Sequence, residues 1–358
     1  MKLLILKAKA PQYLKKINTN SSVFLFLVTS FLIHNVMVYG QEKTEKDTVN
    51  FIYYPDKIMV RANLSTQTDA YLLNNKKGAN LDLETNNSYK LFLSIDYKFI
   101  GFSYGFYPKF FGGNKDEELK GKSSFSDYNF RFFLGRWLQT ANYSKTKGYY
   151  VANMSDFNPD WLEGKDPYLQ FPDFKTIQYG MSTSYLFNPK FSLKSITSFT
   201  EWQKKSAGSF IPSVIYTYNR IISKIDDLNG KQKELDIRLA AGYYYNFIIH
   251  KNFYIAAHLS PSIGVKFLND KSTDSGAETI EKETYFTRNI EGGIKIGYNS
   301  ESILFGASLN FEDSSYNQDK TTVITNDKVY GLLYFGYRFD APGFIAKPVE
   351  KFDNKIKM

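Results

Sequence analysis

A histidine and a serine separated by one residue, in His258-Leu259-Ser260, form the arrangement in this sequence that most resembles catalytic machinery. In an extended strand, residues two apart point to the same face, so the imidazole and the hydroxyl would lie side by side. A histidine that accepts the serine proton would activate the hydroxyl to attack an ester carbonyl. The pair therefore keeps a serine esterase acting on lipid open as one hypothesis.

The residues around this pair favour a structural role instead. Apolar side chains occupy the alternate positions of the same stretch, namely Phe253, Ile255, Ala257, Leu259 and Ile263. His258 and Ser260 consequently belong to its polar face, and Pro261 removes a backbone donor from the strand. An enzyme that cleaves membrane lipid needs its pair on the face that meets lipid. We therefore interpret His258 and Ser260 as part of a polar network.

Other kinds of chemistry have little support. The chain has no cysteine and three histidines, and no two histidines have the spacing of metal ligands. Gly121-Lys122-Ser123 resembles the end of a phosphate-binding loop, but Asp116 stands where the first glycine of that loop should be. We therefore predict no metal site, no cofactor and no enzymatic activity.

The elements that must position these residues are amphipathic strands. Apolar residues alternate with polar residues or glycine in stretches such as 58–65, 91–97, 177–187 and 303–310. Aromatic residues make up 17% of the chain, yet its mean hydropathy is -0.37. A soluble β-sandwich would also alternate, but an apolar outer face with aromatic girdles around a polar interior is typical of a membrane barrel. The sequence predicts an all-β protein, an antiparallel transmembrane β-barrel.

The connections between the strands alternate in length. Short ones are predicted near 97–99, 138–141, 188–189, 250–252 and 299–301, and long polar ones near 68–88, 109–123, 151–175, 221–233, 269–282 and 313–326. Short periplasmic turns and long outer loops are typical of bacterial outer-membrane barrels, which also favour even strand numbers. Treating 190–219 as one long strand predicts about 12 strands, with 10 or 14 as alternatives.

Charged residues recur on the polar faces, which would line the barrel lumen. The predicted set is Arg61, Lys90, Asp96, Arg131, Lys194, Asp236, Arg238, Lys266, Glu291 and Lys295. Charges inside a narrow barrel must be paired or hydrated. One interpretation is an ion-paired interior that fills a small barrel. The other is a water-filled pore whose excess of basic residues favours anions.

The N-terminus has the pattern of an export signal. Residues 1–40 hold five lysines and no acidic residue, and an apolar stretch runs from Val23 to Val38 before Gly40. Cleavage after Gly40 would reduce the net charge from +9 to about +4, which removes most of the case for nucleic-acid binding. We expect a signal peptide at 1–40, a periplasmic lead-in at 41–56, the barrel at 57–339 and a lysine-rich periplasmic tail at 340–358.

Three segments carry a resemblance to a known family. They are Tyr54-Pro55-Asp56-Lys57-Ile58-Met59-Val60-Arg61, Glu201-Trp202-Gln203-Lys204-Lys205-Ser206-Ala207-Gly208-Ser209-Phe210 and Gly336-Tyr337-Arg338-Phe339-Asp340-Ala341-Pro342. Together they resemble an uncharacterised family of Gram-negative outer-membrane β-barrels, the domain-of-unknown-function family 4421, over nearly the whole chain after the signal. The most specific part runs from Gln203 to Ser209. The resemblance implies an outer-membrane barrel and brings no catalytic residue.

The sequence therefore predicts a non-enzymatic barrel in the outer membrane of a Gram-negative bacterium, with a structural or passive-transport role. A small anion-preferring channel is one alternative, and the esterase that would use His258 and Ser260 is the other. The expected partners are outer-membrane lipid, lipopolysaccharide and other envelope proteins, and nucleic acid is not among them.

Overall fold

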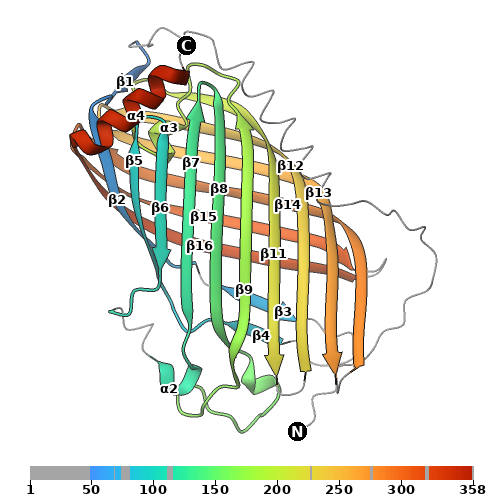
Figure 1. Ribbon diagram of the computed structural model, residues 1–358. Coiled ribbons are helices and arrows are strands. Elements are labelled where there is room, and N and C mark those ends of the chain that lie inside the picture. Colours follow the sequence, from blue (N-terminus) through green and yellow to red (C-terminus); the bar gives the residue numbers. More distant parts are fainter. Residues whose placement is uncertain are drawn as a thin grey trace.

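The computed structural model in Figure 1 describes residues 49–67, 69–73, 81–110, 116–225, 228–274, 277–318 and 322–356. The predicted signal peptide and residues 41–48 of the lead-in lie outside this range. Twelve antiparallel strands of the described chain form a closed ring, as predicted. They are β2 (Lys57–Ser65), β5 (Lys90–Tyr97), β6 (Ile100–Phe106), β7 (Ser124–Leu134), β8 (Trp137–Val151), β9 (Gln170–Tyr185), β11 (Ala207–Ile225), β12 (Leu228–His250), β13 (Phe253–Asp274), β14 (Ala277–Asn299), β15 (Ile303–Gln318) and β16 (Thr322–Asp340).

The two faces of the wall differ as the alternation predicts. The apolar residues Val60, Leu239, Leu309 and Phe335 are exposed on the outside. Their neighbours in the chain alternate inward, and Arg61 is buried. The barrel closes where β16 pairs with β2 and where β8 pairs with β9. An apolar outside around a polar inside is the arrangement of a barrel that sits in lipid.

The short connections lie at one end, which we assign to the periplasm. The chain enters and leaves the barrel at this end, because Lys57 pairs with Asp340. One connection differs from the prediction. Residues 190–219 do not form one strand: the chain turns inward after β9 and re-enters the wall only at Ala207. The count of twelve still holds because the inward segment replaces a short turn at the same end.

Three of the six predicted outer loops are also wrong. Strands β11 and β12 pair as far as Ile225 opposite Leu228, and β13 and β14 pair as far as Asp274 opposite Ala277. Strands β15 and β16 pair up to Gln318 opposite Thr322. These polar stretches form extended hairpins, because backbone pairing continues beyond the membrane although water on both faces removes the apolar alternation.

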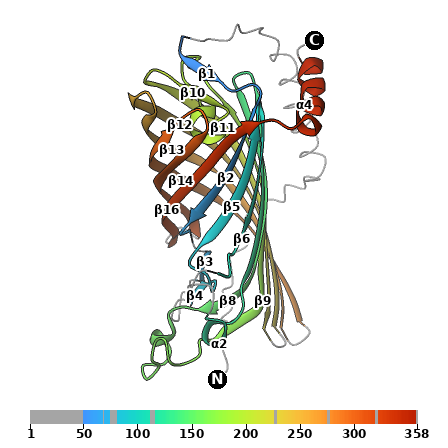
Figure 2. The same ribbon diagram turned by 90° about the vertical axis from the view of Figure 1, so that its left-hand side faces the viewer.

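Smaller elements lie at both ends of the barrel. Strand β1 (Phe51–Tyr53) pairs with β10 (Glu201–Gln203), and β3 (Ala70–Leu73) pairs with β4 (Leu81–Glu84). The short helices are α2 (Glu117–Lys120), a 3-10 turn (Met154–Asp156) and α3 (Lys194–Thr197). The predicted tail contains α4 (Gly343–Ile356), which Figure 2 shows outside the wall at the periplasmic end. There Phe352 stacks on Phe99 with ring centroids 6.0 Å apart.

The lipid-facing position of Leu309 can be tested by a charge. Leu309 lies six residues into β15 and is exposed, so it sits about 14 Å along a strand tilted by roughly 45°, near the middle of an apolar band of about 25 Å. We expect Leu309→Arg to lower the free energy of unfolding by about 2–4 kcal/mol in lipid vesicles, measured by urea titration. Ile303→Arg, at the start of the same strand, is the control and should cost about 0–1 kcal/mol. Equal costs would contradict this placement.

Candidate functional site

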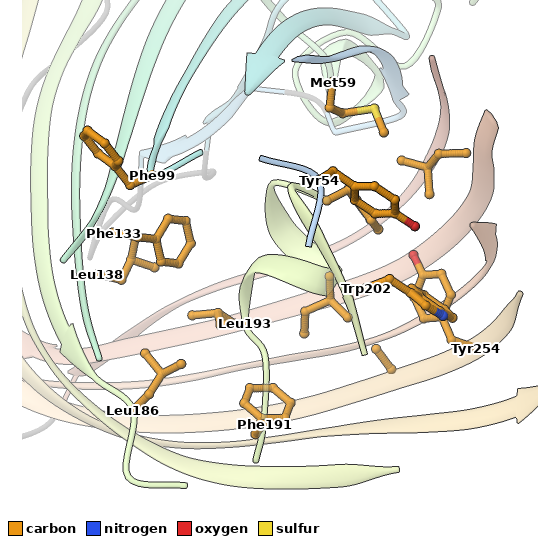
Figure 3. Packing of buried hydrophobic residues seen from close by; sticks show 14 of the residues in the cluster. Tyr54, Met59, Phe99, Phe133, Leu138, Leu186, Phe191, Leu193, Trp202 and Tyr254 are labelled. Carbon is orange, nitrogen blue, oxygen red and sulfur yellow. The ribbon is translucent and has the colours of Figure 1, made fainter. Parts of the chain in front are cut away.

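The periplasmic end of the lumen is occupied by residues 186–206, which we call the plug. The plug contains α3 and β10 and carries buried apolar side chains, among them Phe191, Leu193 and Trp202. These pack with apolar side chains of the wall and the lead-in, as Figure 3 shows for Met59 and Tyr254. Burial of apolar surface is the main force that holds such a segment in place. The segment folds inward because the lumen wall is apolar at this depth.

Phe199 is the centre of the plug and has no exposed surface. Its backbone adopts φ +56°, a conformation that is strained for a residue with a side chain. The Phe199 N–H donates to the Lys194 carbonyl at 2.6 Å, and its own carbonyl accepts a hydrogen bond from Arg338 Nε at 2.9 Å. The guanidinium of Arg61 lies 4.9 Å from the centre of its ring, and Lys295 Nζ lies 5.6 Å away. Groups from three strands thus hold this residue.

Arg338 and Lys295 connect the plug to the wall. Arg338 also donates to Asn299 Oδ1 at 2.7 Å and lies 4.2 Å over the ring of Tyr54. Lys295 Nζ donates to the carbonyl of Ile196, in α3, at 2.7 Å. The plug is therefore held by charge-assisted hydrogen bonds as well as by apolar packing.

A buried carboxylate joins two arginines beside the plug. Asp96 is fully buried, and its two oxygens accept hydrogen bonds from Arg61 NH2 at 2.9 Å and from Arg131 NH2 at 2.8 Å. One negative charge thus faces two positive ones, and Lys295 adds a third cation nearby. The inner border of the plug is therefore basic.

A chamber of about 380 Å³ lies in the lumen beside the plug. Its walls include Arg61, Arg131 and Lys295, the carboxylate of Asp127, and Thr197 of the plug. Most of the remaining lining side chains are polar. The chamber is the space that remains between the plug and the elements that fill the outer part of the barrel.

Strands β3 and β4 lie at the outer end of the barrel (Figure 2), where β4 pairs with the end of β8 through Leu83 and Glu84. Leu83 of β4 is buried against Tyr149, Phe171, Phe174 and Ile221. A second contact fixes the chain before β3: Asp69 accepts hydrogen bonds from Lys90 Nζ at 2.7 Å and from the Tyr107 hydroxyl at 2.6 Å. The aromatic residues of the predicted loop 151–175 thus pack onto the mouth of the barrel.

The predicted lumen charges fall into separate groups. Arg61, Asp96, Arg131 and Lys295 meet beside the plug, and Lys90 pairs with Asp69. Farther along the wall, Arg238 lies 3.5 Å from Asp236, Lys266 lies 3.5 Å from Glu234, and Glu291 bonds Ser260. Lys194 is not on a wall strand, because its segment forms α3 of the plug, where it faces Glu201 at 3.9 Å.

Several acidic residues of the interior were not predicted from the alternation of the strands. They are Asp69, Asp127, Glu234 and Glu312. The predicted excess of basic residues in the lumen largely disappears when these carboxylates are included. Asp69 lies in a connection and could not be found from strand periodicity. Glu234 and Glu312 continue the inward alternation of β12 and β15. They could have been predicted if the alternation had been followed to the ends of those strands.

His258 and Ser260 both lie on the inward side of β13, because Leu259 between them is exposed. The imidazole stacks on the ring of Tyr244, with centroids 5.0 Å apart and planes at 6°. Ser260 is buried and hydrogen-bonds the Glu291 carboxylate across the strand pair. No hydrogen bond between His258 and Ser260 occurs among the contacts of the described residues.

The segment Gln203, Lys204, Lys205, Ser206, Ala207, Gly208 and Ser209 forms the exit from the plug into β11. The fully buried Gln203 accepts a hydrogen bond from the Ser192 N–H at 3.0 Å and donates to the Lys205 carbonyl at 2.7 Å. Ser209 Oγ accepts from the Asn188 N–H at 3.0 Å. These contacts join the two ends of the plug, so this motif determines where the chain returns to the wall.

Within the described ranges, no cluster of three or more acidic or histidine side chains is placed to hold a metal ion. None of the helices that the structure describes has the length and apolar character needed to cross a bilayer.

The Asp96 bridge yields a stability prediction. Asp96→Asn keeps the shape of the side chain but leaves the positive charges of Arg61 and Arg131 buried without their counter-charge. Removing one partner of a buried ion pair costs about 3–5 kcal/mol, and we expect a loss of this size in urea unfolding. Asp340→Asn removes an exposed carboxylate 3.7 Å from Lys57 and should change little. An unchanged unfolding midpoint for Asp96→Asn would contradict the role of the bridge.

Several solved structures are distantly similar to this chain. It is 9% identical to the ferric citrate transporter FecA in the unliganded form, at a TM-score of 0.31, with 81% of this chain and 43% of that chain covered. It is also 9% identical to the ferric yersiniabactin uptake receptor FyuA from Yersinia pestis, at a TM-score of 0.27, with 78% of this chain and 44% of that chain covered. It is 7% identical to the translocator domain of autotransporter NalP from Neisseria meningitidis, at a TM-score of 0.36, with 89% of this chain and 98% of that chain covered.

The chain spans less than half of the length of FecA and of FyuA. No curated protein matches the sequence. The model of the domain of unknown function DUF4421 matches residues 45–339, which include most of the lead-in, the plug and all but the last residue of the ring of strands. The chain therefore belongs to the DUF4421 family of proteins of unknown function.

Proposed function

We propose that this protein is a non-enzymatic outer-membrane barrel that is closed at rest, with a structural or passive-transport role. The observation that carries the proposal is the plug, whose central residue Phe199 is fully buried. Hydrogen bonds from Arg338 and Lys295 hold the plug to the wall at 2.9 and 2.7 Å. A barrel filled in this way serves as a scaffold in the envelope, with lipid, lipopolysaccharide and other envelope proteins as its partners.

The charges of the interior support this proposal. Cations of the wall lie beside carboxylates, such as Lys90 beside Asp69 of a connection at 2.7 Å and Lys266 beside Glu234 of the wall at 3.5 Å. Paired charges suit a filled interior, whereas a wide aqueous pore can leave them hydrated. Export to the outer membrane by a cleavable signal peptide at residues 1–40 is part of the same proposal.

A small anion-preferring channel is the second candidate. It is favoured by the basic side chains Arg61, Arg131 and Lys295 that line the chamber. Movement of the plug would be needed to connect this chamber to the periplasm. Channel function would therefore be gated, and the same basic group would face the permeating ion.

Single-channel recording in planar bilayers tests the closed barrel. We expect the refolded chain 41–358 to be silent, because the plug fills the periplasmic end. Replacement of residues 188–206 by a short Gly-Ser turn should give a steady conductance. A chain that ends at Pro342 and lacks α4 is the control and should stay silent, because α4 lies outside the wall. All variants should first show the heat-modifiable migration of a folded barrel.

Steady conductance of the unmodified chain would contradict the closed-barrel proposal. The reversal potential of the plug-deleted pore in a salt gradient decides the second candidate. Anion preference supports it, and cation preference contradicts it.

The absence of esterase chemistry is also a proposal that can be tested. Because Ser260 bonds Glu291 and His258 stacks on Tyr244, we expect no lipid turnover that depends on the serine. The purified protein and Ser260→Ala should release equal, background amounts of fatty acid from outer-membrane lipid in micelles. Ser262→Ala, on the same face of β13, is the control. Turnover by the unmodified protein that only Ser260→Ala abolishes would overturn this interpretation.

A further inference from the structure

We infer that the chamber beside the plug binds a small anion that carries a carboxylate or phosphate group. Arg61, Arg131 and Lys295 would contact the anionic oxygens. This inference goes beyond the closed-barrel proposal, because binding requires only access of a small molecule and not conduction through the barrel.

The balance of charges at the chamber favours an anion. Three basic side chains line the chamber and face two carboxylates, Asp127 in the lining and the fully buried Asp96, whose two oxygens are both engaged by arginines. The chamber therefore has one basic side chain more than it has carboxylates. Buried charge without a counter-charge is costly, so an anion in this chamber would be stabilised.

The N–H donors of these basic side chains also favour an anion. Arg61 and Arg131 each use one terminal nitrogen, NH2, for Asp96, and a guanidinium carries five N–H donors. Lys295 uses one of its three donors for the Ile196 carbonyl. Guanidinium and ammonium groups are the side chains that bind carboxylate and phosphate oxygens most strongly.

The other side chains of the chamber indicate which groups the ligand would carry besides its anionic group. Asn129, Ser308 and Asn310 line the chamber and can bond hydroxyl or carbonyl groups. Asp127 lies four residues from Arg131 on β7 and faces the same side, which is a separation of about 13 Å along the strand. The anionic end of the ligand would thus seat at the arginines, and a neutral or donor-bearing end would face Asp127.

The size of the chamber restricts the ligand to a small molecule. Its volume of about 380 Å³ lies at the lower end of the range of about 300–1,000 Å³ seen for small-molecule sites. Lipopolysaccharide, nucleic acid and peptides of any length are too large for it.

Isothermal titration of the refolded chain 41–358 in detergent, at low ionic strength, tests the inference. Inorganic phosphate and glutarate are the probes. We expect one of them, or both, to bind with one site per chain, and the probe that binds identifies the anionic group. Lys295→Met should weaken binding at least about tenfold, since a hydrogen bond to a charged group contributes about 1.5–3 kcal/mol. Lys266→Met is the matched control: Lys266 pairs with Glu234 elsewhere in the lumen, so binding should be unchanged.

Ser308→Phe supplies an independent variant in case Lys295→Met disturbs the plug. It fills the chamber and leaves every charge in place, so it should abolish binding while the barrel still folds. If neither probe binds the unmodified chain, or if Lys295→Met and Ser308→Phe bind as well as Lys266→Met, the inference is wrong. Such a failure would leave the closed-barrel proposal intact, because that proposal is decided by conductance.

Discussion

The constraint on which the rest of this structure depends is the hydrogen bonding of the backbone in lipid. A strand in a bilayer has no water to satisfy its N–H and C=O groups, so every strand needs two neighbours and the sheet must close. The pairing of β16 with β2 and of β8 with β9 achieves this closure. A ring of eight strands is filled by its own side chains. A ring of twelve is wider, and additional chain must fill it or water will.

The plug meets this requirement in two ways. At the periplasmic end the wall presents apolar residues such as Met59 and Leu304 to the lumen, and the plug buries its own apolar side chains against them. At its inner border the plug meets Arg61 and Lys295, which contact the Phe199 ring and the Ile196 carbonyl. Nearer the periplasm, Arg338 donates to the Phe199 carbonyl and to the carbonyl of Ser300 in a short turn. One segment thus excludes water and also supplies acceptors for charges that would otherwise be buried alone.

The three segments that carry the family resemblance meet at this plug. Tyr54 and Arg61 come from the first segment, Gln203 from the second and Arg338 from the third. Arg338 lies over the Tyr54 ring and bonds the Phe199 carbonyl, and Gln203 bonds the backbone of Ser192 and Lys205. In this chain the three segments therefore form one structural feature, a plug and its attachment to the wall. The chamber beside it places Lys295 in contact with both the plug and any bound ligand.

The sequence by itself determined the class of fold and the inward and outward faces of the strands. It predicted about twelve strands, with 10 or 14 as alternatives, and the structure decided for twelve. Lipid contact imposes a period of two on every wall strand, and that period is visible in the residue order. The plug was not visible, because Phe191, Leu193 and the polar residues between them alternate as a strand would. The charge pairs were not visible either. Asp69 lies in a connection and reaches Lys90 only because that connection folds into the mouth. The tertiary structure decided these contacts, since a charge is stabilised by its neighbours in space and strand periodicity specifies only the face on which it lies.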